Sequence, residues 1–308
     1  MREFKIDFNK LLPKILIGYA VLFVIGTVMA LIFGVKLDIN FSGGTKIAYS
    51  YTDEIKEADV KKVIDEKLDK AYTFTQSTSL AGDTKTFEIA LSGKNAISAE
   101  TQEALTKALS DSFKDNKIEI YNSNSVSPTI AGSFFAKSLV AVLITAILVI
   151  IYVGWRFRKI GGVTAAITAL CALVFDVLVS FFICVIFGLQ IDSNYIAVVL
   201  TIFGYSLNDT IVIYDRIREN EKFNPDMELG ALVNMSVNKV MIRNIVTTVT
   251  TILAVATIIL VAEVYGLTSL RTFAIPMAFG LLSGAISSLF VSAPLWVVWQ
   301  KARAKKAK

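Results

Sequence analysis

Three ionisable residues stand inside apolar segments of this sequence, where a charge is costly. Asp209 follows the run IAVVLTIFGYSLN, Asp176 lies within LVFDVLVSFF, and Arg243 stands near the start of MIRNIVTTVTTIL. Ionisable groups within membrane spans usually face a bundle interior or a water-filled path, and they often mark ion or proton pathways. These three side chains are therefore the candidates for chemistry.

An aspartate beside an arginine in a membrane can act as a proton site. Burial favours the neutral carboxyl group and a nearby guanidinium favours the ionised form, so small rearrangements can load or release a proton. Helical spacing places Arg243 on one face with several threonines, and we expect this polar stripe to face Asp209. The supporting residues expected around the pair are Asn208, Thr210, Thr247, Thr250 and Thr251. The alternative is a static ion pair that only sets the register of two helices.

Composition excludes several other kinds of chemistry. The chain of 308 residues contains no histidine, which excludes zinc sites with histidine ligands and Ser-His-Asp triads. We expect no metal and no cofactor. The net charge of +5 does not by itself indicate nucleic-acid binding, because the location of the charges matters more than their sum.

The elements that must hold these residues are membrane spans. Hydrophobic residues make up 54% of the chain and only 19% is charged. The apolar residues gather in blocks near the roughly 20 residues that cross a bilayer. The six predicted spans are residues 15–35, 134–155, 161–187, 194–214, 244–263 and 272–298. The chain is thus a polytopic α-helical membrane protein, with a basic tail at residues 299–308.

The basic residues predict the orientation of the spans. They gather before the first span, between the second and third, after the fourth, and in the terminal KARAKKAK, whereas the alternate short loops hold only Arg271. By the positive-inside rule, both termini are expected in the cytoplasm and residues 36–133 outside.

Residues 36–133 predict a small α+β domain outside the membrane. The pattern indicates strands at 45–51, 72–77, 86–91 and 117–122, helices at 54–71 and 99–113, and a turn at Ala81-Gly82-Asp83. The order β-α-β-β-α-β is typical of a ferredoxin-like fold. Ser98 is the expected start of the second helix.

Three segments together resemble the SecF family, a subunit of the bacterial SecDF complex in the resistance-nodulation-division superfamily. They are GYSLNDTIVIYDRIREN, the LDINFSGGTKI stretch after the first span, and the Arg-Phe-Arg after the second. The resemblance covers essentially the whole chain. It implies six spans that form half of a twelve-span unit, with a ferredoxin-like domain between the first two spans.

The resemblance also implies partners and roles. A SecD partner would complete the unit beside the SecYEG channel, and the proton gradient would help to pull preproteins outward after SecA has acted. Asp209 and Arg243 match the family's proton path, and Asp176 is a third candidate. Family members commonly have a histidine where Phe175 stands, so a role for Asp176 cannot rest on an imidazole. They also tend to read Ser-Arg-Thr where this chain has Ile242-Arg243-Asn244, and neither change removes a charged group. The family motif after the first span, including an expected hinge at the glycines, comprises Asp38, Phe41, Gly43 and Gly44.

Two other functions fit parts of the pattern. A proton-driven exporter of lipids or small molecules would share the superfamily, but such exporters usually carry both six-span halves in one chain. An intramembrane aspartyl protease would use Asp176 and Asp209. The absence of a Gly-x-Gly-Asp motif and the different depths of the two carboxylates count against it.

Overall fold

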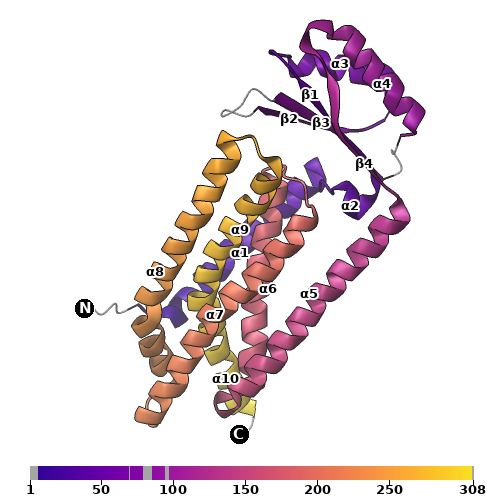
Figure 1. Cartoon of the computed structure of the whole chain (residues 1–308). Coiled ribbons are helices and arrows are strands. Elements are labelled where there is room, and N and C mark those ends of the chain that lie inside the picture. The colour runs from indigo at the N-terminus through magenta and orange to yellow at the C-terminus, as the bar shows by residue number, and fades with distance from the viewer. Residues whose placement is uncertain (1–5, 69, 79–84, 94–96, 307–308) are drawn as a thin grey trace.

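A helix bundle carries a small α+β domain at one end. The computed structural model describes residues 6–68, 70–78, 85–93 and 97–306. Within that part of the chain, six helices are long and apolar enough to cross a membrane. Both ends of the chain lie away from the domain, at the opposite end of the bundle (Figure 1). The predicted fold class, a six-helix membrane protein with an α+β domain between the first two spans, is confirmed.

The helices of the bundle extend beyond the apolar blocks. They are α1 (Phe8–Phe33), α5 (Pro128–Arg156), α6 (Gly162–Ile186), α7 (Ser193–Phe223), α8 (Leu229–Val264) and α9 (Thr268–Ser287), with a 3-10 turn at Arg158–Ile160. Helix α8 begins 15 residues before the predicted 244. Its polar first turns pack on the end of α7, where Asn220 donates a 2.8 Å hydrogen bond to Ser236.

The last span, predicted over 272–298, is one continuous helical segment over Thr268–Lys306, and its hydrogen-bond pattern changes midway. After α9, a π-helix covers Ser288–Ser292, and α10 follows over Ala293–Lys306. Pro294 supplies the cause, because it lacks the N–H that an α-helix would bond to the carbonyl of Phe290. Such single-turn π segments are frequent at functional sites.

The domain has the predicted ferredoxin-like topology. Its elements are α2 (Ile39–Ser42), β1 (Gly44–Tyr51), α3 (Glu57–Lys67), β2 (Thr73–Thr78), β3 (Lys85–Ser92), α4 (Ala99–Ser112), a 3-10 turn at Lys114–Asn116, and β4 (Glu119–Val126). The sheet is antiparallel with the order β2-β3-β1-β4. Ser98 caps α4, as expected. The predicted turn at residues 81–83 lies outside the described residues.

One helix of the domain is shorter than predicted. Helix α3 covers Glu57–Lys67 rather than 54–71. Ile55 and Leu68 flank it and remain buried in the same core as Val60 and Ile64. Their burial explains the longer prediction, because apolar periodicity marks a buried face without showing where the helical backbone ends.

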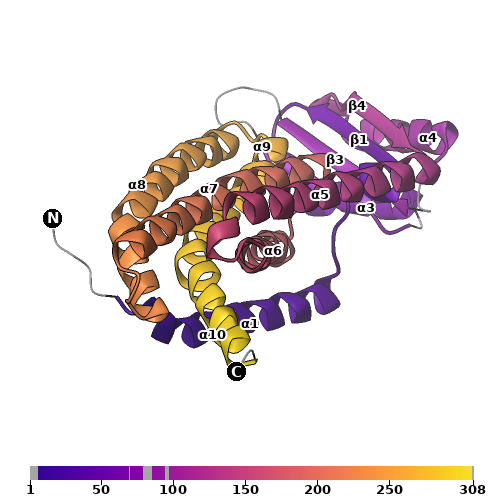
Figure 2. The same cartoon turned by 90° about the horizontal axis from the view of Figure 1, so that it is seen from below.

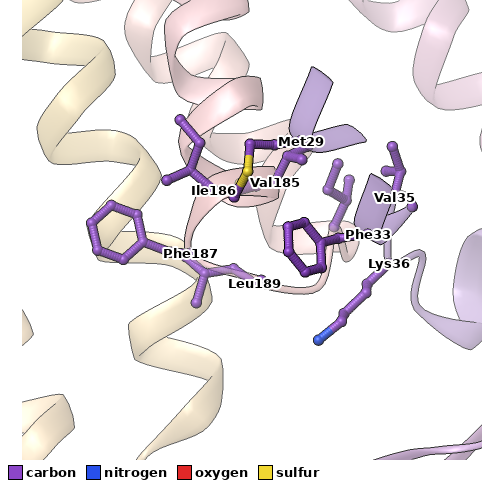
Figure 3. Close-up of a pocket in the computed structure, with 12 residues that line it drawn as sticks. Met29, Phe33, Val35, Lys36, Val185, Ile186, Phe187 and Leu189 are labelled. Carbon is purple, nitrogen blue, oxygen red and sulfur yellow. The ribbon is translucent and has the colours of Figure 1, made fainter. Parts of the chain in front are cut away.

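The domain joins the bundle through the link between α6 and α7. Ile191 in that link accepts a hydrogen bond from the backbone N–H of Asp38 at 3.1 Å and donates one to the carbonyl of Lys36 at 2.9 Å. A pocket of about 270 Å³ lies beside this junction. Figure 3 shows its apolar lining, with Phe33 and Phe187 well apart and the Lys36 side chain extending beyond Phe33.

Candidate functional site: buried carboxylates in the helix bundle

Asp176 lies at the centre of a polar cluster that joins three helices. Its side chain on α6 is fully buried. Ser206 of α7 donates to Oδ2 at 2.7 Å, Ser287 of α9 donates to Oδ2 at 2.9 Å, and Ser283 of α9 donates to Oδ1 at 2.7 Å. We call these three hydroxyls the serine cage. It supplies the hydrogen bonds that a buried carboxylate requires.

Two glycines on α9 make the serine cage possible. A β-carbon on Gly284 would lie 3.0 Å from Cβ of Ser206 and 3.5 Å from Oδ2 of Asp176. A β-carbon on Gly280 would lie 2.2 Å from Cδ1 of Ile202. The absence of side chains at both positions lets α9 approach α7 closely enough for the serines of both helices to reach one carboxylate.

Hydrogen bonds extend from the serine cage to α1. The Tyr19 hydroxyl lies 3.0 Å from the hydroxyl of Ser283, which in turn donates to Asp176. A separate buried cluster lies further along α7, where the Tyr214 hydroxyl meets Thr168 at 2.7 Å and Ser292 of the π-helix at 2.9 Å. The bundle interior therefore holds polar groups over several helical turns.

Asp209 lies near the serine cage but has a different environment. It is 3% exposed, and its Oδ2 atom is buried without a hydrogen-bond partner among the described residues. Ser206 precedes it by three residues, so Asp209 is about 4.5 Å further along α7 than the residue that contacts Asp176. The structure thus places two carboxylates on successive levels of one interior.

The expected Asp209–Arg243 ion pair is not formed within 4.0 Å among the described residues. Arg243 is exposed on α8, although it is close enough to act on Asp209 electrostatically. In the expected polar stripe, Thr250 is exposed and Thr247 and Thr251 are half-buried, so a stripe that faces Asp209 stays a prediction. Thr247, Thr250 and Thr251 direct their hydroxyls to carbonyls of their own helix.

The buried polar face of α8 is shifted by one residue from the predicted stripe. Asn244 is 1% exposed and Thr248 is 6% exposed. Neither side-chain amide atom of Asn244 has a hydrogen-bond partner in the part of the chain that the structure describes, and the Thr248 hydroxyl has none. The Asn220–Ser236 bond joins α7 to α8, and twelve residues from it lead to Asn208 on α7 and to Thr248 on α8. By this count Thr248 is about level with Asn208, the residue before Asp209.

The two neighbours of Asp209 have different surroundings. Thr210 is buried and donates to the carbonyl of Ser206 at 3.2 Å, whereas Asn208 is exposed. Like Asp209 on α7, Asn244 and Thr248 on α8 are buried and carry polar atoms that have no partner among the described residues. Polar atoms of this kind are the ones that bind water or exchange protons.

The motif after α1 forms the attachment of the domain. Asp38 is 4% exposed, caps α2 through the N–H of Asn40 at 3.0 Å, and lies 3.6 Å from the ammonium of Lys46. Phe41 stacks on Phe134 of α5 with ring centroids 5.6 Å apart. These contacts explain why Asp38 and Phe41 are present in the motif, without a role in a hinge.

The two glycines of this motif are required by close packing. Gly43 has a φ of 74°, and a β-carbon there would lie 2.8 Å from Cα of Pro128. A β-carbon on Gly44 would lie 1.9 Å from the carbonyl oxygen of Leu91. A hinge at these glycines stays a prediction.

Comparison with known proteins shows the family to which the chain belongs. The family model for the C-terminal part of the protein export membrane proteins SecD and SecF matches residues 105–302. The protein translocase subunit SecF of Alicyclobacillus acidocaldarius is 33% identical over 297 residues, which cover 92% of this chain and 89% of that protein. The chain belongs to the SecF family.

Two longer SecDF proteins contain a segment that is similar to this whole chain. The protein translocase subunit SecDF of Bacillus subtilis is 32% identical over 315 residues, which cover 98% of this chain and 39% of that protein. The crystal structure of SecDF from Thermus thermophilus matches with a TM-score of 0.81 and 27% identity, over 97% of this chain and 39% of that one. This SecF-family chain thus spans about two fifths of the SecDF chains.

Sequence reasoning found Asp209 and Asp176 but missed the serine cage. Serines are ordinary residues in apolar helices, and nothing in a single helix indicates which carboxylate they contact. A signal was present, however, in the spacing of Gly280, Ser283, Gly284 and Ser287. These positions share one face of a helix, and such faces of small residues permit close helix contact.

Proposed function

We propose that this chain is the SecF subunit of a Sec protein translocase and that its buried carboxylates couple the proton gradient to late steps of protein export. The serine cage is the observation that carries this proposal. Asp176 accepts hydrogen bonds from α7 and α9 while it sits on α6. A carboxylate accepts four hydrogen bonds, whereas a protonated carboxyl group must donate one of its own. Proton binding therefore changes the contacts among three helices.

Asp209 supports the same role at the neighbouring level of the bundle. Its unpartnered Oδ2 and the unpartnered atoms of Asn244 and Thr248 offer places for water beside a titratable group. Arg243 acts on Asp209 from the exposed side of α8. In the proposed cycle, Asp209 binds and releases protons on their way through the bundle. Protonation of Asp176 then changes its hydrogen bonds to the serine cage.

The gradient supplies enough energy to bias such a change. A potential of 100 mV contributes about 2.3 kcal/mol for each charge that crosses the membrane. A ligand shifts a two-state equilibrium only by its differential affinity for the two states. The differential contacts here are the hydrogen bonds of the serine cage, and the movement reaches the domain through the link between α6 and α7.

The proposed partner is SecD, which would supply the other six spans. SecDF proteins of Bacillus subtilis and Thermus thermophilus carry the matching segment within a chain of which it covers 39%. The exposed face of α8 that carries Arg243 would then face the partner. The SecYEG channel and preproteins delivered by SecA complete the proposed assembly.

The proposed location is the cytoplasmic membrane, with both termini in the cytoplasm and the domain outside. Both chain ends lie at the end of the bundle away from the domain (Figure 1). The basic residues gather at that same end, in the link between α5 and α6 and in α10. This distribution supports the orientation through the positive-inside rule.

Export into inverted membrane vesicles tests the proposal. The vesicles contain this chain, SecD and SecYEG, and SecA with ATP starts translocation before ATP is removed and the gradient is kept. Asp209→Asn keeps the size of the side chain but cannot carry a proton, and it should reduce gradient-driven completion at least tenfold. Asp226→Asn, in the exposed link between α7 and α8, is the matched control and should export like wild type. Equal export by Asp209→Asn and wild type would contradict the proposal.

A further inference from the structure

A groove between α1 and α9 lies on the lateral surface of the helix bundle and leads inward to the serine cage. It has a volume of about 310 Å³. Its apolar lining is formed by Ile15, Gly18, Leu22, Phe279, Leu282 and Ile286. Figure 2 shows α1 along one edge of the bundle. Ile17 and Val21 on that outer face are 64% and 54% exposed.

Gly18 creates the space within the groove. A β-carbon built on Gly18 has no atom within 4 Å, so the backbone of α1 borders open space at this point. From Lys14 to Leu22 the groove follows α1 for about 12 Å, which is most of the ~15 Å depth of one leaflet of hydrocarbon. The groove therefore has the length and the lining that suit an acyl chain.

One end of the groove carries a positive charge. Lys14 is the charged residue of the lining, and it lies near the start of α1, at the end of the bundle where the chain termini lie. It has no ion-pair partner among the described residues. A lysine at the membrane boundary keeps its ammonium at headgroup level while its stem lies along apolar surface.

From these features we infer that the groove binds an anionic phospholipid, with its phosphate at Lys14 and one acyl chain along Gly18. Charge complementarity selects an anionic headgroup, and the apolar lining selects a lipid chain over a soluble anion. The site does not depend on the proposed proton coupling, because it is defined by binding alone.

The inferred site adjoins the hydrogen bonds that lead to Asp176. Tyr19 and Ser283 line the groove as its polar residues, and their hydroxyls lie 3.0 Å apart. Ser283 also donates to Asp176 at 2.7 Å. A lipid chain in the groove would therefore pack against the outer end of the serine cage.

Native mass spectrometry of the purified full chain tests the inference. The protein in detergent is titrated separately with phosphatidylglycerol and with phosphatidylcholine of the same chain length. Wild type should retain phosphatidylglycerol at least fivefold more strongly. Gly18→Leu fills the groove and should reduce retention of both lipids at least fivefold. Lys14→Gln should remove the preference for phosphatidylglycerol.

Matched controls separate this site from general lipid contact. A β-carbon on Gly132 of α5 also meets open space, so Gly132→Leu should leave retention unchanged. Lys159→Gln removes an exposed charge in the link between α5 and α6 and should keep the preference. Thermal melting of each variant shows whether it remains folded.

Three results would overturn the inference. Equal retention of the two lipids by wild type would show that charge is not recognised. Unchanged retention by a folded Gly18→Leu variant would show that lipid binds elsewhere. In a parallel co-purification with SecD, loss of SecD from the folded Gly18→Leu variant, with its lipid retention unchanged, would assign the groove to the partner chain.

Discussion

Ser283 on α9 donates a 2.7 Å hydrogen bond to Asp176 on α6, deep inside a bundle of apolar helices. This bond joins the last span to the third span. Because Ser206 and Ser287 donate to the same carboxylate, the charge state of one side chain is tied to the packing of α6, α7 and α9. The relationship between Ser283 and Asp176 explains how a proton could move helices.

Removing the Asp176 carboxylate should destabilise the bundle. Asp176→Ala leaves three buried hydroxyls without their acceptor. At roughly 1–3 kcal/mol for each unpaired buried group, the cost is about 3–9 kcal/mol. Asp176→Asn keeps an acceptor oxygen and should cost about 1 kcal/mol. Thermal unfolding in detergent measures both. Equal melting temperatures for Asp176→Ala and wild type would show that the serine cage contributes no stability.

A side chain at Gly284 should separate α9 from α7. Gly284→Val places methyl groups against Ser206 and Asp176, since even a β-carbon would lie 3.0 Å from Cβ of Ser206. Overpacking of this kind typically costs about 1–3 kcal/mol. Gradient-driven export should fall together with the melting temperature. Gly132→Val, which borders open space on α5, is the control and should change neither quantity.

Asn244 should matter for proton movement more than for stability. Both side-chain amide atoms are buried without partners among the described residues. Asn244→Leu has a similar volume and removes the unpaired polar groups, so the melting temperature should stay equal or rise. Gradient-driven export should fall, because unpaired polar groups on the buried face of α8 are lost. A variant that exports like wild type would remove Asn244 from the proton path.

Lys46 should stabilise the junction of the domain over a wide pH range. Burial lowers the pKa of its ammonium, but the hydrogen bonds and charges of Glu88 and Asp38 outweigh burial, and the net pKa is raised. A raised pKa of a base contributes stability that is complete below its unfolded value of about 10.4 and is lost as pH rises through the folded value. The melting temperatures of Lys46→Met and wild type should therefore differ by a constant amount from pH 7 to pH 9. The difference should shrink at more alkaline pH, and a difference that grows there would contradict this account.

The spans and the topology of the domain could be predicted from the sequence because both rest on apolar periodicity. Blocks near 20 residues mark the membrane helices, and alternating patterns mark β1 and β3. The start of α8 at Leu229 could not be predicted in this way, since its first turns are held to α7 by contacts such as the Asn220–Ser236 bond. The π-helix depends on Pro294, whose effect on a span is not fixed by the sequence pattern alone.

The sequence predicted the two buried carboxylates of the candidate site, but it did not predict the side chains that surround them. Charge within an apolar block identifies Asp209 and Asp176 directly. The face of α8 that points inward could not be read from apolar periodicity, because membrane helices are apolar on both the lipid side and the protein side. The structure shows Asn244 and Thr248 on the inner face, one residue along from Arg243 and Thr247.

The central claim is that the buried carboxylates carry protons across the membrane, and proton flux in proteoliposomes tests it most directly. Vesicles containing this chain and SecD, with a pH-sensitive dye inside, are exposed to an acidic exterior. Wild type should acidify the interior faster than empty vesicles, whereas Asp209→Asn should match the empty vesicles and Asp226→Asn, in the exposed link between α7 and α8, should match wild type. Equal acidification rates for Asp209→Asn and wild type would contradict the account.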